Sequence, residues 1–263
     1  MVCIDNKVPI LERGNILDNK ILNNMQDTPY DFLKLQYLDH SDGVLAGIKL
    51  YAKDYDLIIA PGIIKWKGFY YRVYTDTIIK IPKEDGDYIF KIRFLPTRSI
   101  EEEKYTLYRM EVFHTFDKST KDDEMEIMHI KRREGAIVRN ISVFPGINEE
   151  YNIINEITKV QSTSTGRSFP ESLLKLFANE VFEKKSPDIL DEMFCHSILN
   201  GRITRESIRQ YILHKLDKDI NKNNNKEDNI CIYDHLEKIY KNMHNSIAKS
   251  RQEHSRNGLL IVE

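Results

Sequence analysis

The sequence is poor in cysteine and has no arrangement of cysteines that would support a disulfide framework. Its 263 residues include three cysteines, Cys3, Cys195 and Cys231, and no C-x-x-C pair. An odd and sparse count is typical of a reducing compartment. The N-terminal stretch lacks a basic segment followed by an apolar core, and no apolar run approaches the ~20 residues that span a bilayer. We therefore expect a chain that is made and folded in the cytoplasm and has no membrane partner.

Strong net charge and phosphate-binding loops are also missing. The formal net charge is −2 at pH 7, which gives no electrostatic reason to expect nucleic acid as a partner. Neither G-x-x-x-x-G-K-S/T nor G-x-G-x-x-G occurs, so no nucleotide-binding loop is predicted. The pair Asp191-Glu192 is similar to the acidic pair of a helicase. Without a phosphate loop, we interpret it as two solvated residues early in a helix.

Catalytic and metal-binding patterns are lacking as well. No G-x-S-x-G occurs, and the acidic runs 101–103 and 122–124 are typical of solvated loops. Residues that could hold zinc occur without the paired spacing of zinc sites, namely Cys195, His196, His214, Cys231 and His235. We predict that the protein is not an enzyme and that it needs neither a metal nor any other cofactor.

What the sequence does contain is a run of short strands and tight turns between His40 and Tyr74. Branched and aromatic residues form the strand candidates, and small or turn-forming residues separate them. The turn residues are Asp42, Gly43, Gly47, Pro61, Gly62 and Gly68. Because the chain must reverse at Gly62 and Gly68, we expect both to adopt backbone angles that disfavour a side chain.

Further strand candidates follow as far as residue 142. The segment Tyr88–Leu95 alternates cleanly, and Lys104–Phe116, Met125–Arg132 and Ala136–Ser142 are also predicted as strands. About eight strands separated by turns are typical of an antiparallel sandwich or open barrel. The polar, Ser- and Thr-rich segment 159–169 then predicts a linker.

The periodicity becomes helical after the predicted linker. Helices are expected from Pro170 to Lys184, up to Asn200-Gly201, from Thr204 onward, and from Ile230 to His254. The expected fold class is α+β, an N-terminal antiparallel β sandwich or open barrel followed by a C-terminal helical segment. The predicted domains are an N-terminal arm (1–29), a β-rich domain (30–158) and a helical domain (170–263).

The N-terminal arm and the helical domain both carry apolar stripes that need a cover. In the arm, the spacing of Ile21, Leu22 and Met25 predicts a short helix that Thr28-Pro29 ends, either docked on a neighbour or packed on its own chain. The segment 30–38 is expected to lead into the first strand. In the helical domain, the candidate interface residues without an obvious internal partner are Leu213, Leu259, Leu260, Ile261 and Val262.

One family resemblance rests on the turn-rich stretch. The segments DHSDGV (39–44), Gly47, IIAPGI (58–63), Gly68 and the tyrosines 70–71 stand in the order of a recurring N-terminal module. This stretch resembles that module in tail and baseplate proteins of Firmicutes-type phages and phage-like contractile bacteriocins. The resemblance covers residues 30 to 75, and its glycines and prolines are markers of fold rather than of catalysis.

The resemblance implies a structural component of a phage tail or contractile injection particle, at the baseplate or the tail-fibre attachment. Such a component would act as an adaptor through protein–protein contacts. Its partners would be other tail or baseplate proteins, a tail fibre among them, and it could form a homo-oligomer. It would be cytoplasmic during assembly and then part of the phage or phage-tail-like particle.

Two other classes of function stay open at the level of sequence. A carbohydrate- or cell-wall-binding module could use Trp66, Phe69, Tyr70 and Tyr71 as a stacking platform, which would have to be exposed to solvent. A hydrolase could assemble its site from carboxylates on distant strands, which would require a deep cleft with two buried acids.

Overall fold

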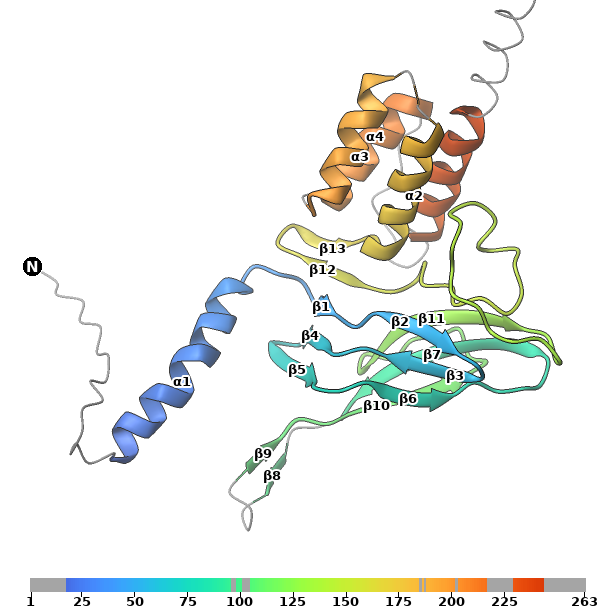
Figure 1. Ribbon diagram of the computed structural model, residues 1–263. Helices are drawn as coiled ribbons and strands as arrows, with labels where there is room; N and C mark the ends of the chain where they lie inside the picture. Colours follow the sequence, from blue (N-terminus) through green and yellow to red (C-terminus); the bar gives the residue numbers. More distant parts are fainter. Residues whose placement is uncertain are drawn as a thin grey trace, which may run out of the picture. The chain divides into compact units, whose positions relative to one another are not determined.

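The protein combines β-sheets with helices, which confirms the predicted α+β class (Figure 1). The structure, a computed structural model, describes residues 18–95, 98–100, 105–184, 186, 188–201, 203–216 and 229–243. The chain divides into two units, Met1–His40 and Ser41–Glu263. The predicted division into an arm, a β-rich domain and a helical domain concerns independent folding, and it stays a prediction.

The first unit is built on the helix α1 (Asn19–Gln36). Its N-cap is Asp18, whose side chain accepts a 2.8 Å hydrogen bond from the backbone N–H of Ile21. The prediction that the helix ends at Thr28-Pro29 is wrong, because Pro29 lies inside it, and the strand expected over 30–38 is also wrong. A proline removes one hydrogen bond of the helix, but its φ angle is compatible with helix, and the apolar spacing continues beyond it.

The largest sheet has the strand order β13-β12-β1-β4-β5. Strand β1 lies antiparallel to β4 and parallel to β12. Its strands are β1 (Gly43–Gly47), β4 (Gly62–Trp66), β5 (Phe69–Val73), β12 (Gln161–Thr163) and β13 (Gly166–Ser168).

The linker predicted over 159–169 is wrong, because that segment forms the β12–β13 hairpin and joins the largest sheet. The segment bonds to the distant Ser41 through both a side chain and the backbone. The Ser162 hydroxyl donates to the carbonyl oxygen of Ser41 at 2.5 Å, and the backbone N–H of Ser41 donates to the carbonyl oxygen of Thr163. Serine and threonine therefore belong here to a strand pair rather than to a solvated connection.

Two three-stranded sheets and a short hairpin complete the β part. The sheets have the orders β2-β3-β6 and β10-β7-β11, and β8 pairs with β9. Their strands are β2 (Leu50–Lys53), β3 (Asp56–Ile59), β6 (Thr77–Lys80), β7 (Gly86–Phe94), β8 (Arg98–Ile100), β9 (Tyr105–Leu107), β10 (Met110–Thr115) and β11 (Glu124–Arg132). The strand predicted over 104–116 is thus divided between β9 and β10.

The strand predicted over Ala136–Ser142 is wrong, because this segment forms only an isolated bridge between Arg139 and Ile153. Its apolar residues serve two different cores. Val138 packs in the β core, whereas Ile141 packs against the helical core. A segment that passes from one core to the other cannot bury one continuous face as a strand does.

The three larger sheets share one hydrophobic core, to which each sheet contributes. The strand predicted over Tyr88–Leu95 is confirmed, and Tyr88, Phe90, Ile92 and Phe94 are all buried, but Ile89 and Lys91 on the other face are buried too, so burial does not alternate along β7. Residues from β1, β3, β4 and β11 join them. Trp66 stacks on Phe94 with the ring centroids 4.6 Å apart.

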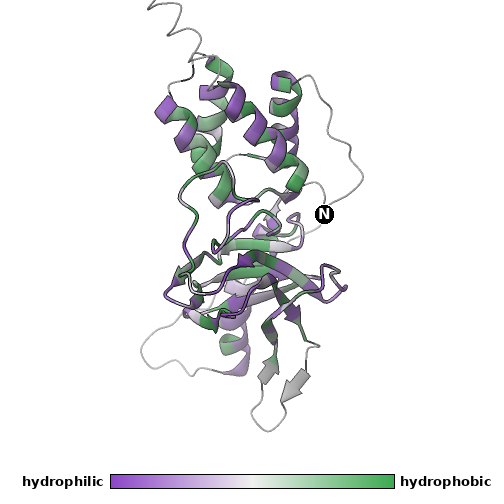
Figure 2. Ribbon diagram, turned by 90° about the vertical axis from the view of Figure 1, so that its right-hand side faces the viewer, coloured by the Kyte–Doolittle hydropathy of each residue, from purple (hydrophilic) through white to green (hydrophobic). Residues whose placement is uncertain are grey.

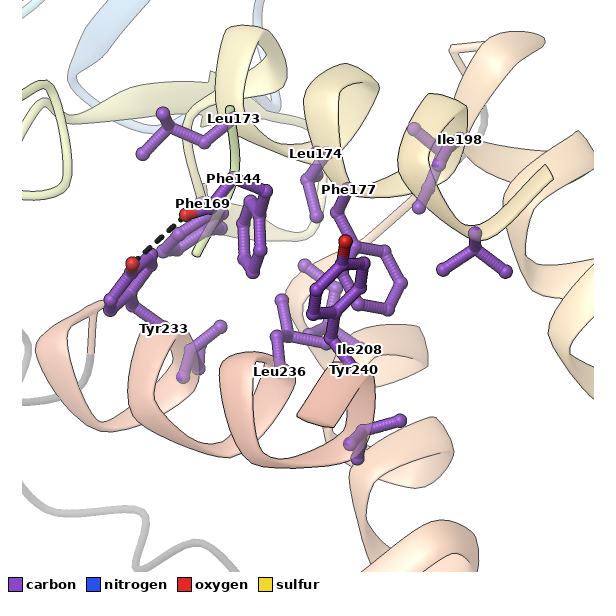
Figure 3. Close-up of a cluster of buried hydrophobic side chains, with 14 of the residues drawn as sticks. Phe144, Phe169, Leu173, Leu174, Phe177, Ile198, Ile208, Tyr233, Leu236 and Tyr240 are labelled. Atoms are coloured by element: carbon purple, nitrogen blue, oxygen red, sulfur yellow. Dashed lines mark hydrogen bonds between the residues drawn. The ribbon is translucent and has the colours of Figure 1, made fainter. Parts of the chain in front are cut away.

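The helices enclose a second core (Figure 3). They are α2 (Glu171–Lys184), α3 (Ile189–Leu199), α4 (Arg205–Leu216) and the helical segment 229–243. Hydrophobic and hydrophilic residues alternate along them, as Figure 2 shows. The predicted helix end at Asn200-Gly201 is confirmed, with Asn200 as C-cap and Gly201 at a φ of 66°. The predicted continuation to His254 lies outside the described residues.

The chain before α2 closes the helical core. Phe144, Ile147, Ile153, Ile157 and Phe169 all pack in it. Hydrogen bonds reinforce this contact. The Tyr233 hydroxyl donates to the carbonyl oxygen of Phe144 and accepts from the N–H of Ile147, each at 2.9 Å, and Asn229 Nδ2 donates to the carbonyl oxygen of Ile157 at 2.8 Å. The segment 144–169 therefore covers much of the apolar surface that the helices present.

Candidate docking surface

Asp42 lies beside the turn that contains Gly68, at the end of β1 that begins with Gly43. Lys67 and Gly68 form the turn between β4 and β5, with φ angles of 47° and 81°. Two positive φ values in succession are typical of the tight hairpin turn in which a second-position glycine is favoured. Asp42 holds this turn, because its Oδ1 accepts a 2.9 Å hydrogen bond from the N–H of Lys67. Gly43 has a φ of 142° and lies close to Val160.

Gly47, Pro61 and Gly62 meet at the other end, where β1 pairs with β4 through Gly47 and Gly62. The expectation of a positive φ is met by Gly68 but is wrong for Gly62, whereas Gly47, for which none was predicted, has a φ of 69°. Gly62 is restricted by space instead. A Cβ there would lie 2.4 Å from the backbone nitrogen of Ile48 and 2.5 Å from the carbonyl oxygen of Ala46. The turn residues of the motif thus specify the fold and form no chemical site.

The aromatic residues after the motif do not form an exposed platform. Trp66 is 8% exposed, and Tyr70 and Tyr71 are also buried. Phe69 is exposed but leans on Tyr108, with the ring centroids 5.5 Å apart. A sugar-binding site would need the face of Trp66, which Phe94 occupies. The structure therefore offers no observation in favour of the carbohydrate-binding alternative.

Two buried acids on β11 do line a common cavity, which bears on the hydrolase alternative. Glu124 and Glu126 face a space of about 50 Å³ beside Trp66 and Thr158. A space of this size is close to that of one or two water molecules and far below the several hundred Å³ of a ligand pocket. The Thr158 hydroxyl donates to Glu126 Oε1 at 2.5 Å.

Glu124 has the electrostatics of a structural anion. Burial raises its pKa, but the hydrogen bonds from Arg93 Nη2 (2.9 Å) and the N–H of Lys121, with the charge of Lys91, outweigh that effect. Its pKa therefore lies below its ordinary value, whereas a general acid needs a raised one. Glu124 therefore ties β11 to Arg93 of β7, and its lowered pKa gives no support to a general-acid role.

The candidate zinc ligands are not brought together. Cys231 Sγ lies 3.4 Å from His235 Nδ1 on one helical turn, but Cys195 is buried in the helical core. Burial, with a smaller contribution from Asp191, raises the pKa of the Cys195 thiol to about 12. Among the described residues, no group of three or more His, Cys, Asp or Glu side chains is placed to hold a metal ion.

Asp191 corrects the sequence interpretation most clearly. It was expected to be solvated, but its side chain is fully buried, whereas Glu192 is exposed. It accepts hydrogen bonds from Ser186 Oγ (2.6 Å) and the Tyr211 hydroxyl (2.8 Å) and pairs with Lys215 Nζ at 2.8 Å. The pair ties α3 to α4. Sequence reasoning missed it because the partners lie on a different helix.

Helix α3 exposes apolar side chains on the face directed away from Asp191, since Ile189 and Met193 each lie two positions from it. Ile189 is 69% exposed and Met193 62% exposed, and the two are four positions apart, so they lie on one face. The sequence of α3, ILDEMFCHSIL, is apolar on more than one side, which is the signal that could have found this surface. Of the candidate interface residues, Leu213 is half-buried, and residues 259–262 lie outside the described residues.

Beside Met193 a surface depression of about 410 Å³ runs between α3 and α4, the α3–α4 groove. Its residues are Leu190, Met193, Phe194, Ser197, Thr204, Glu206, Ser207, Gln210, Tyr211 and His214. Phe194 and Tyr211 form its floor, with the rings stacked at 3.8 Å. Exposed Glu206, Gln210 and His214 form a polar rim along α4. An apolar floor with a polar rim is the anatomy of a protein-docking surface.

The comparisons with known proteins identify no family. No protein-family model matches the sequence, and no curated protein does. Within the described residues, every helix falls short of the length and apolar character that a membrane-spanning segment requires.

Two solved structures are similar to this chain at a low level. One is a crystal structure of TssK, with a TM-score of 0.36 and 8% identity, covering 90% of this chain and 69% of that one. The other is the TssK-TssF-TssG baseplate subcomplex of the type VI secretion system, with a TM-score of 0.36 and 8% identity, covering 92% and 100%. A likeness this low does not establish a shared fold, so neither structure informs the function of this chain.

Proposed function

We propose that this protein is a non-enzymatic structural component of a contractile injection particle, phage tail or phage-like bacteriocin, at the baseplate or the tail-fibre attachment. It acts as an adaptor that joins other proteins of the particle. Two things support the proposal. The segments within residues 39–71 carry the resemblance to the tail and baseplate module, and in the structure these segments contribute to the paired strands β1, β4 and β5.

The observation that carries the adaptor role is the α3–α4 groove with Ile189 and Met193 exposed beside it. Single exposed apolar side chains are common, but two that lie next to an apolar floor form a patch of the kind that marks an interface. The occupant that fits is an amphipathic helix of a neighbouring particle protein. Its apolar residues, spaced three and four apart, would lie on Phe194 and Met193, and its polar residues would meet the rim of α4.

The experiment uses point variants of the full chain, because the helices share their core with the segment 144–169 and have not been shown to fold alone. The docking variant is Met193→Glu, which places a charge at the centre of the exposed face. The matched control is Glu192→Gln, which changes the neighbouring exposed residue without adding charge to the groove. Each variant replaces the wild-type gene in a host that makes the particle.

The measured quantities are the amount of the protein in purified particles and the killing or infection titre. We expect Met193→Glu to lower incorporation at least tenfold while the melting temperature of the purified protein stays unchanged. Glu192→Gln should be incorporated normally. Wild-type incorporation and titre for Met193→Glu would overturn the docking role of the groove.

A further inference from the structure

Helix α1 has an apolar stripe that is not buried within its own unit. None of its residues is buried, and Phe32 is 66% and Leu35 71% exposed. Ile21, Met25, Thr28, Phe32 and Leu35 follow one another at intervals of four and three residues. This alternation is the seam spacing of helices that pack side by side. We call these five residues the α1 seam. Its spacing indicates a helical partner rather than a flat or β-stranded one.

Thr28, the polar member of the α1 seam, already has a hydrogen-bond partner within the helix. The Thr28 hydroxyl donates a 2.7 Å hydrogen bond to the carbonyl oxygen of Asn24 on the preceding turn. Its methyl group is therefore the part available to a partner. A hydroxyl that is already bonded within the helix can enter an apolar interface without the penalty of an unpaired polar group.

The helix needs a cover in order to be stable. A helix of 18 residues is marginal in water when no tertiary contact supports it. Pro29 inside it disfavours the helix more than any other residue type would, because it removes a backbone hydrogen bond. The Asp18 cap and the exposed ion pair between Lys34 and Asp31 offset only part of that cost. Burial of the seam is the source of stabilisation that remains.

The charges beside the α1 seam fit a second copy. The positions that flank it are Leu22, Pro29 and Gln36 on one side, and Asn24 and Asp31 on the other, so a single acid is the only formal charge. Flanking charges set partner choice when helices pair. Here they neither repel an identical helix nor select an oppositely charged one. The seam is self-complementary.

The width of the stripe indicates how many copies meet. At about 100° per residue, the exposed apolar side chains from Leu22 round to Leu35 span about 140° of the helix. A two-stranded coiled coil uses a narrower seam, whereas a helix inside a bundle buries a stripe of this width. We infer that α1 packs against α1 of further copies of this chain, in a bundle of roughly three or more helices. The inference names a further copy of this chain as one partner of the proposed adaptor. The packing of α1 does not depend on the proposed function, whereas the role of that packing in a particle rests on it.

The test is the oligomeric state of the purified full chain, measured by light scattering after size-exclusion chromatography. Wild-type protein should have a mass that is a multiple of the 31.0 kDa single chain, at threefold or above. The double variant Phe32→Gln/Leu35→Gln should run as a single chain and lose helical circular dichroism. Glutamine keeps the helix propensity, so loss of helix in this variant reports loss of the partner.

A control variant and an independent readout make the result decisive. Asn23→Gln/Asp27→Gln changes the opposite, exposed face of α1 and should leave the mass unchanged. The fluorescence of Trp66, the single tryptophan, follows unfolding of the second unit and should have the same midpoint in all variants. A single-chain mass for wild type at about 100 μM, or a dimer, or an oligomer that survives the seam variant, would each overturn the inference. Particle incorporation of Met193→Glu is measured separately, so the two proposals can fail independently.

Discussion

Helices α1 and α2 start from similar sequence patterns and differ in what covers them. Both carry apolar residues at helical spacing, but α1 buries none of its 18 residues, whereas α2 buries Leu173, Leu174, Phe177, Ala178 and Val181 among its 14. The stripe of α2 meets α3 and the segment 144–169. Amphipathic spacing therefore identifies the face of a helix that needs a cover, but it does not say whether the same chain supplies the cover.

The sharpest test of this comparison exchanges one phenylalanine in each helix for alanine. Phe177 is fully buried and meets the rings of Phe144, Phe194 and Tyr211, so Phe177→Ala should destabilise the second unit by about 3–5 kcal/mol. Phe32→Ala should change the same quantity by less than about 0.5 kcal/mol. Urea denaturation followed by Trp66 fluorescence and circular dichroism measures both. Equal losses would mean that the chain's own second unit covers α1, which would contradict the difference in burial between α1 and α2.

Asp191 and Glu192 are neighbours in α3, but Asp191 is buried and Glu192 is exposed. Asp191→Ala removes one of the two carboxylates that pair with Lys215, the other being Asp188, and leaves the hydroxyls of Ser186 and Tyr211 without this acceptor. We expect a loss of about 3 kcal/mol, the scale for breaking a buried ion pair. Glu192→Ala, at the exposed neighbouring position, should stay within about 0.5 kcal/mol of wild type. Chemical denaturation at pH 7 compares them, and a neutral effect of Asp191→Ala would show that the network contributes nothing.

Gly62 and Gly68 differ in a similar way, because a side chain at Gly62 would meet the backbone, whereas one at Gly68 would face open space. Gly62→Val should destabilise by more than about 1 kcal/mol, because the new Cβ meets the backbone of Ile48 and Ala46. Gly68→Ala faces open space and should lose about 1 kcal/mol through its φ of 81° alone. Melting temperatures of both variants separate the two causes. If Gly68→Ala is the more damaging, the steric account of Gly62 is wrong.

The smallest expected effect is a pH dependence at Glu124. Its pKa in the folded state lies below the unfolded value, so it stabilises the protein above about pH 4.3, and this contribution is lost as pH falls through the folded pKa. Glu124→Gln should cost about 1 kcal/mol at pH 7 and less at pH 3. The exposed Glu111→Gln is the matched control and should show no such difference. A loss from Glu124→Gln that is the same at both pH values would contradict this account.

Periodicity in the sequence predicted the strand and helix content well where one element faces one core. The stripes of α2 and α4 are such cases. It failed where local chemistry and tertiary context disagree. The sequence predicts a helix end at Pro29, which lies inside α1, and a linker over 159–169, which forms the β12–β13 hairpin with the Ser162 hydroxyl bonded to the distant carbonyl oxygen of Ser41.

The site was predictable only in part for a related reason. The turn residues Asp42, Gly43, Gly47 and Gly68 were found because glycine and aspartate restrict the backbone locally. The α3–α4 groove was not found, because it depends on which face of α3 the other helices leave open. The burial of Asp191 depends in the same way on Tyr211 and Lys215, which lie 20 and more positions away in the chain.

The sequence by itself determined the α+β class, the turns that reverse the chain around β1 and β4, and the apolar face of each helix, since all of these follow from backbone restrictions and from side-chain spacing within one element. The tertiary structure alone decided which faces are covered. It placed Phe144 and Phe169 on the helical core, buried Asp191 and left the stripes of α1 and α3 exposed. The reason is that burial depends on the surfaces that distant segments bring together, and no local pattern encodes those surfaces.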